Sequence, residues 1–331
     1  MKTSVNTNIK ITFHITQTHK SDYSMHEIIN LKQLKNYCHR VYHVKITLHV
    51  IYALTPKLPL CYNPYVMIDD MNILNQNKVP HIQMLGITGI PEIKSGDCLA
   101  SIIMSAADKQ GTPIAPWDII VITQKIVSKA EGRIRDLQKV KPSPKAHEIA
   151  LTTGRDSHIV ELILRESRSI VRLDASRGII IVETKHGFVC ANAGIDTSNI
   201  PGDNMVSLLP ENPDGSASTI RDIIRQTLNG APLSIIISDT FGRAWREGQT
   251  NFAIGVAGMN PLRDYKGTID SCGKMIKSTN IAVADELASS AELMSAKSNN
   301  IPVVIIRGYA FSEELGSTDA LLRHRTEDLF R

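Results

Sequence analysis

The sequence predicts an α/β fold with a mixed β-sheet, and three observations lead to this class. Short runs rich in Ile and Val recur at 118–123, 178–194, 232–240 and 301–308, each bounded by turn residues as strands are. Helical patterns fill the intervals between them. Within the second run, "ETKHGFV" is typical of a hairpin turn, which joins antiparallel strands. The sheet is therefore expected to be mixed and not of the plain doubly wound type.

The individual elements follow from local signals. Three of the four runs are built around consecutive apolar residues without alternation, which is typical of strands buried on both faces. Ser143 and Pro144 supply a cap and a first turn for a helix through "KAHEIALTTG", and a second helix follows Asp156. A third helix is expected over 216–230, with Gly230 as its C-cap.

Length and composition limit the possible functions. The 331 residues, 42% of them hydrophobic, can bury a substantial core and allow one large or two ordinary domains. No apolar stretch is long enough to span a bilayer and no signal-peptide pattern opens the chain, so we expect a cytoplasmic protein without a membrane partner. The five cysteines form no CxxC pair, which argues against a zinc knuckle or a disulfide framework.

The formal charge of +4 is concentrated near the N-terminus. Residues 1–83 hold nine Lys or Arg and four Asp or Glu, whereas the rest of the chain holds 28 basic and 29 acidic residues. Seven of the eleven histidines also lie there, at irregular spacings that do not favour a metal site. We therefore expect a basic extension over 1–83, either disordered or a misplaced start, and a main domain over 84–331 without a nucleic-acid partner.

Common nucleotide and hydrolase signatures are missing. The sequence has no GxxxxGK[ST] phosphate loop, no GxGxxG after a strand and no GxSxG elbow, and "HEIAL" at His147 lacks the second histidine of a zincin. Neither a P-loop nor a Rossmann fold is expected.

Polar residues instead follow the predicted strands. Asp196 and Asn199 come after "FVCANAG", and Asp239 and Thr240 come directly after "LSIIIS". Two carboxylates from different strands can hold a divalent ion that keeps open positions for phosphate oxygens. The alternative is that both aspartates only cap helices or turns.

Basic residues near these strand ends also have two interpretations. Arg243 and Arg246 follow Asp239 and either place two cations at the same sheet edge or form a solvated face. Lys129 in "SKAEGR" lies within about a turn of a strand end. It can either reach a phosphate or pair with Glu131 on the surface.

Seven stretches share their order and approximate spacing with one family: "IPEIKSGDCLA" (90–100), "VSKAEGR" (127–133), "NAGIDTSN" (192–199), "NPDGSA" (212–217), "SDTFGRAWREGQTNFAIGVAG" (238–258), "ADELASSAELM" (284–294) and "IPVVIIRG" (301–308). Together they resemble the coenzyme F420-0:L-glutamate ligases. The resemblance covers about residues 84–331 and none of 1–83. It implies a two-lobed gamma-glutamyl ligase fold of mixed α/β type and a homodimer.

The resemblance implies a GTP-dependent amide ligase of coenzyme F420 biosynthesis. Such an enzyme joins L-glutamate to the carboxylate of F420-0 and can add further γ-linked glutamates, releasing GDP and phosphate each time. The carboxylate would first become an acyl phosphate, which the glutamate amine then attacks. Two alternatives stay open, namely a metal-dependent phosphohydrolase and a catalytically silent nucleotide-binding paralogue.

The same resemblance assigns roles to individual residues. Asp196 and Asp239 are the implied ligands of one or two Mg²⁺ or Mn²⁺ ions, Thr240 faces the second ion, and Lys129 contacts phosphate. A monovalent cation is a further candidate cofactor. The implied nucleotide-binding residues are Ile90, Pro91, Glu92, Ile93, Gln124, Lys125, Lys129, Asn199, Ser295, Ala296 and Lys297.

Two positions depart from the family pattern. At Gln124 and Lys125 the family often has small hydroxyl residues. In "SAKSNN" (295–300), Ala296 and Lys297 stand where relatives can carry an acidic residue associated with the second metal. Lys297 either places its ammonium against nucleotide phosphates or is a solvated loop lysine.

Overall fold

The chain divides into two units, Met1–Asn77 and Lys78–Arg331. The structure, a computed structural model, describes residues 79–296 and 298–329, all of them in the second unit. The histidine-rich stretch that the sequence assigns to an N-terminal extension lies almost entirely outside the described residues, as does Lys297.

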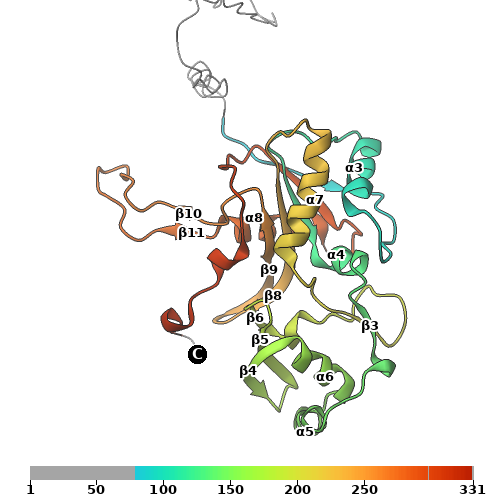
Figure 1. Ribbon diagram of the computed structural model, residues 1–331. Helices are drawn as coiled ribbons and strands as arrows, with labels where there is room; N and C mark the ends of the chain where they lie inside the picture. Colours follow the sequence, from blue (N-terminus) through green and yellow to red (C-terminus); the bar gives the residue numbers. More distant parts are fainter. Residues whose placement is uncertain (1–78, 297, 330–331) are drawn as a thin grey trace, which may run out of the picture. The chain divides into compact units, whose positions relative to one another are not determined.

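A five-stranded mixed sheet forms the centre of the second unit (Figure 1). Only β2 and β8 run parallel, and the other neighbouring strands are antiparallel, so the predicted mixed sheet is confirmed. In spatial order its strands are β1 (Gln83–Ile87), β12 (Val303–Arg307), β2 (Ile119–Thr123), β8 (Ser234–Arg243) and β9 (Arg246–Ala257).

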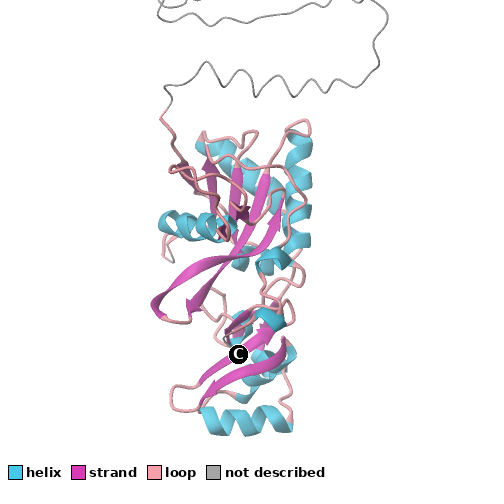
Figure 2. Cartoon of the chain, turned by 90° about the vertical axis from the view of Figure 1, so that its left-hand side faces the viewer, coloured by secondary structure: helices cyan, strands magenta, loops and turns pink. Residues whose placement is uncertain are grey.

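Helices cover both faces of this sheet (Figure 2). On one face, α3 (Leu99–Gln110) and α7 (Pro213–Thr227) pack against residues that include Ile120 and Ile235. On the other face, α8 (Val283–Ser295) packs against residues that include Val121 and Ile236. Consecutive strand residues thus enter opposite buried layers, which explains why the sequence shows continuous apolar runs and no alternation.

A second, three-stranded sheet forms the smaller lobe. Its strands are β4 (Ser167–Asp174), β5 (Ile179–Thr184) and β6 (Val189–Ala191), and α5 (Pro144–Thr153) and α6 (Ser157–Arg165) pack on it. The expected hairpin is present, because β5 and β6 are antiparallel. The short strands β3 (Ile134–Asp136) and β7 (Met205–Ser207) pair beside this lobe.

The remaining elements are short. Strands β10 (Arg263–Asp264) and β11 (Asn280–Ile281) form the base of an extended arm that Figure 1 shows projecting from the sheet. Four 3₁₀ turns complete the described residues: Leu137–Lys139, Asn192–Gly194, Thr318–Leu321 and Arg325–Glu327. None of the described helices is both long enough and apolar enough to span a membrane.

Two helix starts agree with the sequence and one helix does not. Ser143 accepts a hydrogen bond from the Ala146 amide, and Asp156 accepts one from the His158 amide, so both expected caps are confirmed. Helix α7 starts three residues earlier than expected, because the Asn212 side chain accepts from the Gly215 amide and Pro213 occupies the first turn. The prediction that Gly230 is its C-cap is wrong, since the cap is Leu228.

Strand β8 is longer than expected. The sequence predicted a strand within 232–240 with Asp239 and Thr240 at its end, but β8 continues to Arg243 and pairs with β9 down to Arg246. The intervening turn consists of Ala244 and Trp245, which carry none of the usual hairpin-turn signals. Asp239 is therefore a strand residue whose backbone pairs with Phe252.

Deletion of residues 1–77 is expected to leave a folded and active protein. The boundary at 83 that the sequence suggested would remove Gln83 from β1, where it pairs with Arg307. It would also remove His81, whose carbonyl oxygen lies only 2.6 Å from the position of a Cβ on Gly308. A melting temperature and a turnover equal to those of the full chain would support this boundary, and insoluble or inactive protein would contradict it.

Candidate active site

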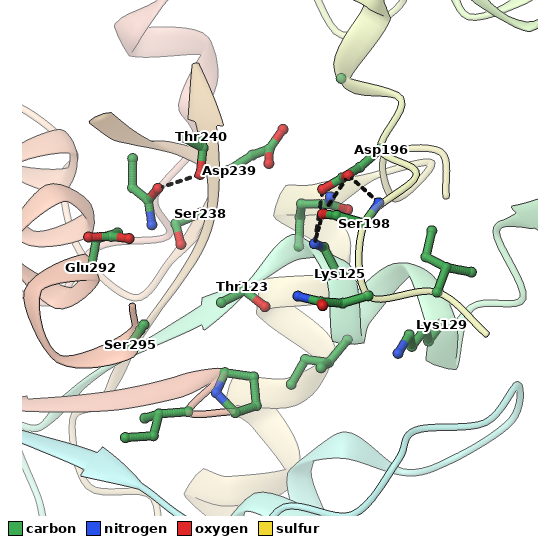
Figure 3. Close-up of a pocket in the computed structure, with 18 of the residues that line it drawn as sticks. Thr123, Lys125, Lys129, Asp196, Ser198, Ser238, Asp239, Thr240, Glu292 and Ser295 are labelled. Carbon is green, nitrogen blue, oxygen red and sulfur yellow. Dashed lines mark hydrogen bonds and ion pairs between the residues drawn. The ribbon is translucent and has the colours of Figure 1, made fainter. Parts of the chain in front are cut away.

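A cavity of about 860 Å³ lies at the edge of the central sheet where β2 ends and its pairing with β8 stops. Because these two strands are parallel, the carboxyl end of β2 and residues 238–240 of β8 meet here, at an edge where α/β folds commonly bind ligands. The lining segments are the 90–93 loop, α4 (Gln124–Ala130), the 191–201 segment after β6, the β8–β9 hairpin and residues 292–302. Figure 3 shows the polar side chains that project into this cavity.

Asp196 lies on the loop that follows β6, beyond a tight turn. Gly194 has φ 69°, and a Cβ there would come within 2.8 Å of the Leu209 side chain, so the turn requires glycine. One carboxylate oxygen of Asp196 accepts hydrogen bonds from the Ser198 amide (2.7 Å) and hydroxyl (2.8 Å). The other lies 2.9 Å from the Lys125 ammonium. Asp196 therefore caps a local turn and also lines the cavity.

The charge on Asp196 is stabilised in place. Partial burial raises the pKa of its carboxyl, but the Ser198 amide and hydroxyl and the Lys125 ammonium outweigh this effect. The pKa consequently lies below the ordinary value for aspartate. Asp196 is an anion at neutral pH, as a ligand for a cation must be.

Asp239 and Thr240 enter the same cavity from β8. In Figure 3 the Asp239 carboxylate extends toward the side of the cavity that carries Asp196. The Thr240 hydroxyl donates a hydrogen bond to the Asn251 side-chain oxygen at 2.8 Å, and Asn251 is buried on β9. This bond uses the hydroxyl proton and leaves the lone pairs of the Thr240 oxygen for another partner.

Lys129 lies on α4, which starts directly where β2 ends. Its side chain is almost fully buried, and its ammonium lies 2.5 Å from a Glu92 carboxylate oxygen. The alternative that Lys129 pairs with Glu131 on the surface is wrong, because Lys129 is buried and pairs with Glu92, and Glu131 accepts a hydrogen bond from Ser216. The helix turns Lys129 inward toward the 90–93 loop and places it on the cavity wall.

The other residues predicted to bind nucleotide line the same cavity, with one exception. They come from the 90–93 loop, the first turn of α4, the loop after β6 and the end of α8: Ile90, Pro91, Glu92, Ile93, Gln124, Lys125, Asn199, Ser295 and Ala296. Lys297 lies outside the described residues. The structure thus brings together side chains that are up to about two hundred positions apart in the sequence.

The two arginines after Asp239 lie elsewhere. Arg243 donates to the carbonyl oxygens of Glu247 and Gly248 at the tip of the β8–β9 hairpin, and Arg246 is exposed. Neither is among the described residues that line the cavity. Of the two interpretations, the one that placed both arginines at one edge with Asp239 is wrong, because Arg243 and Arg246 pair with each other at the hairpin tip, where β8 ends and β9 begins.

Comparison with known proteins gives a consistent family. A model of the F420-0:gamma-glutamyl ligase family matches residues 88–308. The chain belongs to this family. A coenzyme F420:L-glutamate ligase of Methanothermobacter thermautotrophicus is 46% identical over 253 residues, which cover 76% of this chain and 99% of that protein. Proteins of the same name from Methanocaldococcus jannaschii and Methanopyrus kandleri are 46% and 40% identical, covering 66% and 72% of this chain and 86% and 94% of their own length.

Among the cavity residues of this ligase that had no role assigned from the sequence are Ser198, Asn251 and Glu292. Ser198 stands two residues after Asp196, a spacing typical of an aspartate turn, so its contact was open to prediction. Asn251 becomes visible only through the β8–β9 register. Glu292 could have been noticed in the sequence, because it is an acidic residue in the last turn of a helix, where basic residues are favoured.

The donor set fits a hard divalent cation. Asp196, Asp239 and Thr240 offer only oxygen atoms, which Mg²⁺ and Mn²⁺ prefer, and the first two are carboxylates. Hydrogen bonds from Ser198 and to Asn251 orient Asp196 and Thr240 from behind, as supporting contacts do around metal ligands. Within the described part of the chain, no three His, Cys, Asp or Glu side chains gather closely enough to hold a metal by themselves.

Thiol labelling gives a direct test of the environment of this site. Burial and the nearby Asp239 charge raise the pKa of the Cys190 thiol, and a hydrogen bond from the Gly194 amide lowers it. The net result is a pKa of about 12. Three pKa units reduce the thiolate fraction roughly 1,000-fold below that of an ordinary thiol. The Cys98 thiol is exposed, and hydrogen bonding at Ser101 lowers its pKa. Iodoacetamide at pH 8 is therefore expected to label Cys98 in the native protein and Cys190 only after unfolding. Peptide mass spectrometry would show which thiol is labelled. Comparable labelling of both thiols in the native protein would contradict this prediction.

Proposed function

We propose that this ligase joins L-glutamate to coenzyme F420-0 at the expense of GTP and proceeds through an acyl phosphate. The observation that carries the proposal is the single cavity that gathers Asp196, Asp239, Thr240 and Lys129. The names of the relatives support the two substrates, and the cavity chemistry supports phosphoryl transfer.

The proposed reaction has two steps. A carboxylate oxygen of F420-0 attacks the γ-phosphorus of GTP, the bond to the β,γ-bridging oxygen breaks, and GDP leaves. The deprotonated amine of glutamate then attacks the carbonyl carbon of the acyl phosphate. The carbon–oxygen bond to phosphate breaks, phosphate leaves and an amide remains.

The first step brings anions together, so cations must lie near the transferred group. Lys129 and Lys125 are the two lysines among the described residues that line the cavity, and each is held by a carboxylate, Glu92 and Asp196 respectively. Both ammonium groups are thereby kept at the wall in reach of an arriving phosphate. A divalent ion held by Asp196, Asp239 and Thr240 would offset the charge that develops on the phosphate oxygens.

The alternatives predict different products from the same mixture. Purified protein would be incubated with F420-0, L-glutamate, Mg²⁺ or Mn²⁺ and either GTP or ATP, and analysed by mass spectrometry. The proposal requires F420-0 to gain one or more glutamyl residues only when both substrates and a nucleotide are present. Nucleotide hydrolysis without an acceptor would indicate a phosphohydrolase, and nucleotide binding without turnover would indicate a silent paralogue. The homodimer, the cytoplasmic location and a monovalent cation remain predictions from the sequence.

A further inference from the structure

Glu292 is an acidic side chain of the cavity for which the proposed phosphoryl transfer has no role. It lies on the last turn of α8 and is half-buried. Figure 3 shows it on the α8 side of the cavity, near Ser238 and away from Lys129. Its carboxylate forms no hydrogen bond or ion pair with another residue that the structure describes.

The position of Glu292 is unfavourable for the isolated chain. The carboxyl end of a helix carries a partial negative charge, so an acidic residue there is destabilising and a basic one is favoured. Helix α8 has no basic residue in its last turn. Glu292 therefore adds negative charge to a corner of the cavity that is already electronegative. Local rules are broken in this way most often where a ligand supplies the compensation.

Glu292 differs from two other carboxylates of the cavity, because each of those is paired with a lysine. Glu92 is paired with Lys129 and Asp196 with Lys125. Glu292 does not join Asp196 and Asp239 in a three-carboxylate cluster, since the described residues contain no such metal-binding group. The cavity thus has a basic wall at α4 and an acidic corner at the end of α8.

We propose that Glu292 binds the α-ammonium group of the L-glutamate substrate. This proposal rests on the ligase function proposed above. An ammonium group needs several acceptors, and the corner offers the Glu292 carboxylate and the lone pairs of the Ser295 hydroxyl, whose proton goes to the Ala291 carbonyl. One carboxylate with neutral oxygens suits a single positive charge better than a divalent ion, which recruits more carboxylates.

The assignment makes Glu292 a specificity-determining residue. Glutarate has both carboxylates of glutamate and lacks only its amine. A site that recognises the ammonium must bind glutamate more tightly than glutarate, and Glu292 must be the source of that difference.

The binding test compares the wild type with Glu292→Gln, which keeps the shape and removes the charge. Isothermal titration with glutamate and with glutarate is expected to show glutamate affinity falling roughly 10- to 100-fold in the variant. Glutarate affinity should be unchanged, so the preference for glutamate disappears. A preference that persists in Glu292→Gln would overturn the proposal.

Steady-state kinetics provide the second readout. In Glu292→Gln the KM for glutamate should rise by the same factor while the KM values for F420-0 and GTP stay constant. An equal rise in all three KM values would overturn the proposal and indicate a general role in the site. A changed potassium requirement with an unchanged KM for glutamate would also overturn it and indicate a role in binding a monovalent cation. Wild-type protein that forms no glutamyl product would instead overturn the ligase function, and the glutamate-against-glutarate titration would still decide whether Glu292 recognises the ammonium group.

Glu286→Gln is the matched control, because Glu286 lies on the same helix, is exposed and does not line this cavity. It should leave every ligand constant unchanged. Folding is checked by the melting temperature, which should not fall in Glu292→Gln, since the change removes a charge that opposes the helix dipole.

Discussion

Asp239→Asn is expected to lower the turnover of this ligase by at least about 100-fold while the protein stays folded. The side chain enters the cavity from β8, and its carboxylate is one of two that can hold a divalent cation. Asparagine preserves the size and leaves the backbone pairing with Phe252 in place. The loss therefore comes from the missing charge, which weakens metal binding and with it the stabilisation of the transferred phosphoryl group.

The measurement combines turnover with Mn²⁺ binding followed by electron paramagnetic resonance. Asp108→Asn serves as the control, because Asp108 is exposed on α3 and does not line the cavity. Asp196→Asn should resemble Asp239→Asn, although it also leaves the Lys125 ammonium without its carboxylate partner. Near-normal turnover and Mn²⁺ binding in folded Asp239→Asn would remove this residue from the metal site.

The meeting point of the strand ends was predictable from the sequence. Continuous apolar runs identify β2 and β8 as buried strands, and polar residues that follow such strands gather at one edge once the strands are parallel. Lys129 and Asp239 could be assigned to this edge on that basis, because Lys129 follows β2 and Asp239 follows the apolar part of β8. Asp196 follows β6 of the separate three-stranded sheet, and the family resemblance assigned it and Lys125 to the same site.

The side-chain partners were not predictable, because they depend on register and on distant segments. One of the two interpretations paired Lys129 with Glu131, two positions away, but Lys129 pairs with Glu92, which lies 37 positions earlier. The Thr240 contact with Asn251 requires the pairing of β8 with β9, and β8 itself extends past its apolar part because the turn at Ala244 and Trp245 carries no local signal. Local propensity sets where elements exist, whereas tertiary packing decides where they end.

Arg307→Met is expected to lower the free energy of unfolding by about 3 kcal/mol, the low end of the range for breaking a buried ion pair. Arg307 ends β12 and binds both carboxylate oxygens of Asp118, each at 2.7 Å, just before β2 begins. Asp118 is 0% exposed, and its carboxylate also accepts the Ala115 amide. The variant would leave a fully buried anion without its cation, although the 36% exposure of the Arg307 side chain lets water offset part of the cost.

Thermal unfolding should register this loss as a fall in melting temperature of roughly 6–12 °C. Lys145→Met removes one partner of the exposed pair with Glu148 and should change stability by less than about 0.5 kcal/mol. The double variant Asp118→Asn with Arg307→Met retains an acceptor for the Ala115 amide but carries no buried charge. It should regain most of the stability, because the cost in the single variant comes from the unpaired carboxylate and not from lost packing. A double variant as unstable as Arg307→Met alone would contradict that explanation. Thr123, at one end of β2, lines the cavity, whereas Asp118 and Arg307 lie at the other end of β2 and the adjacent end of β12. The ligand affinities of the folded single variant should therefore equal those of the wild type.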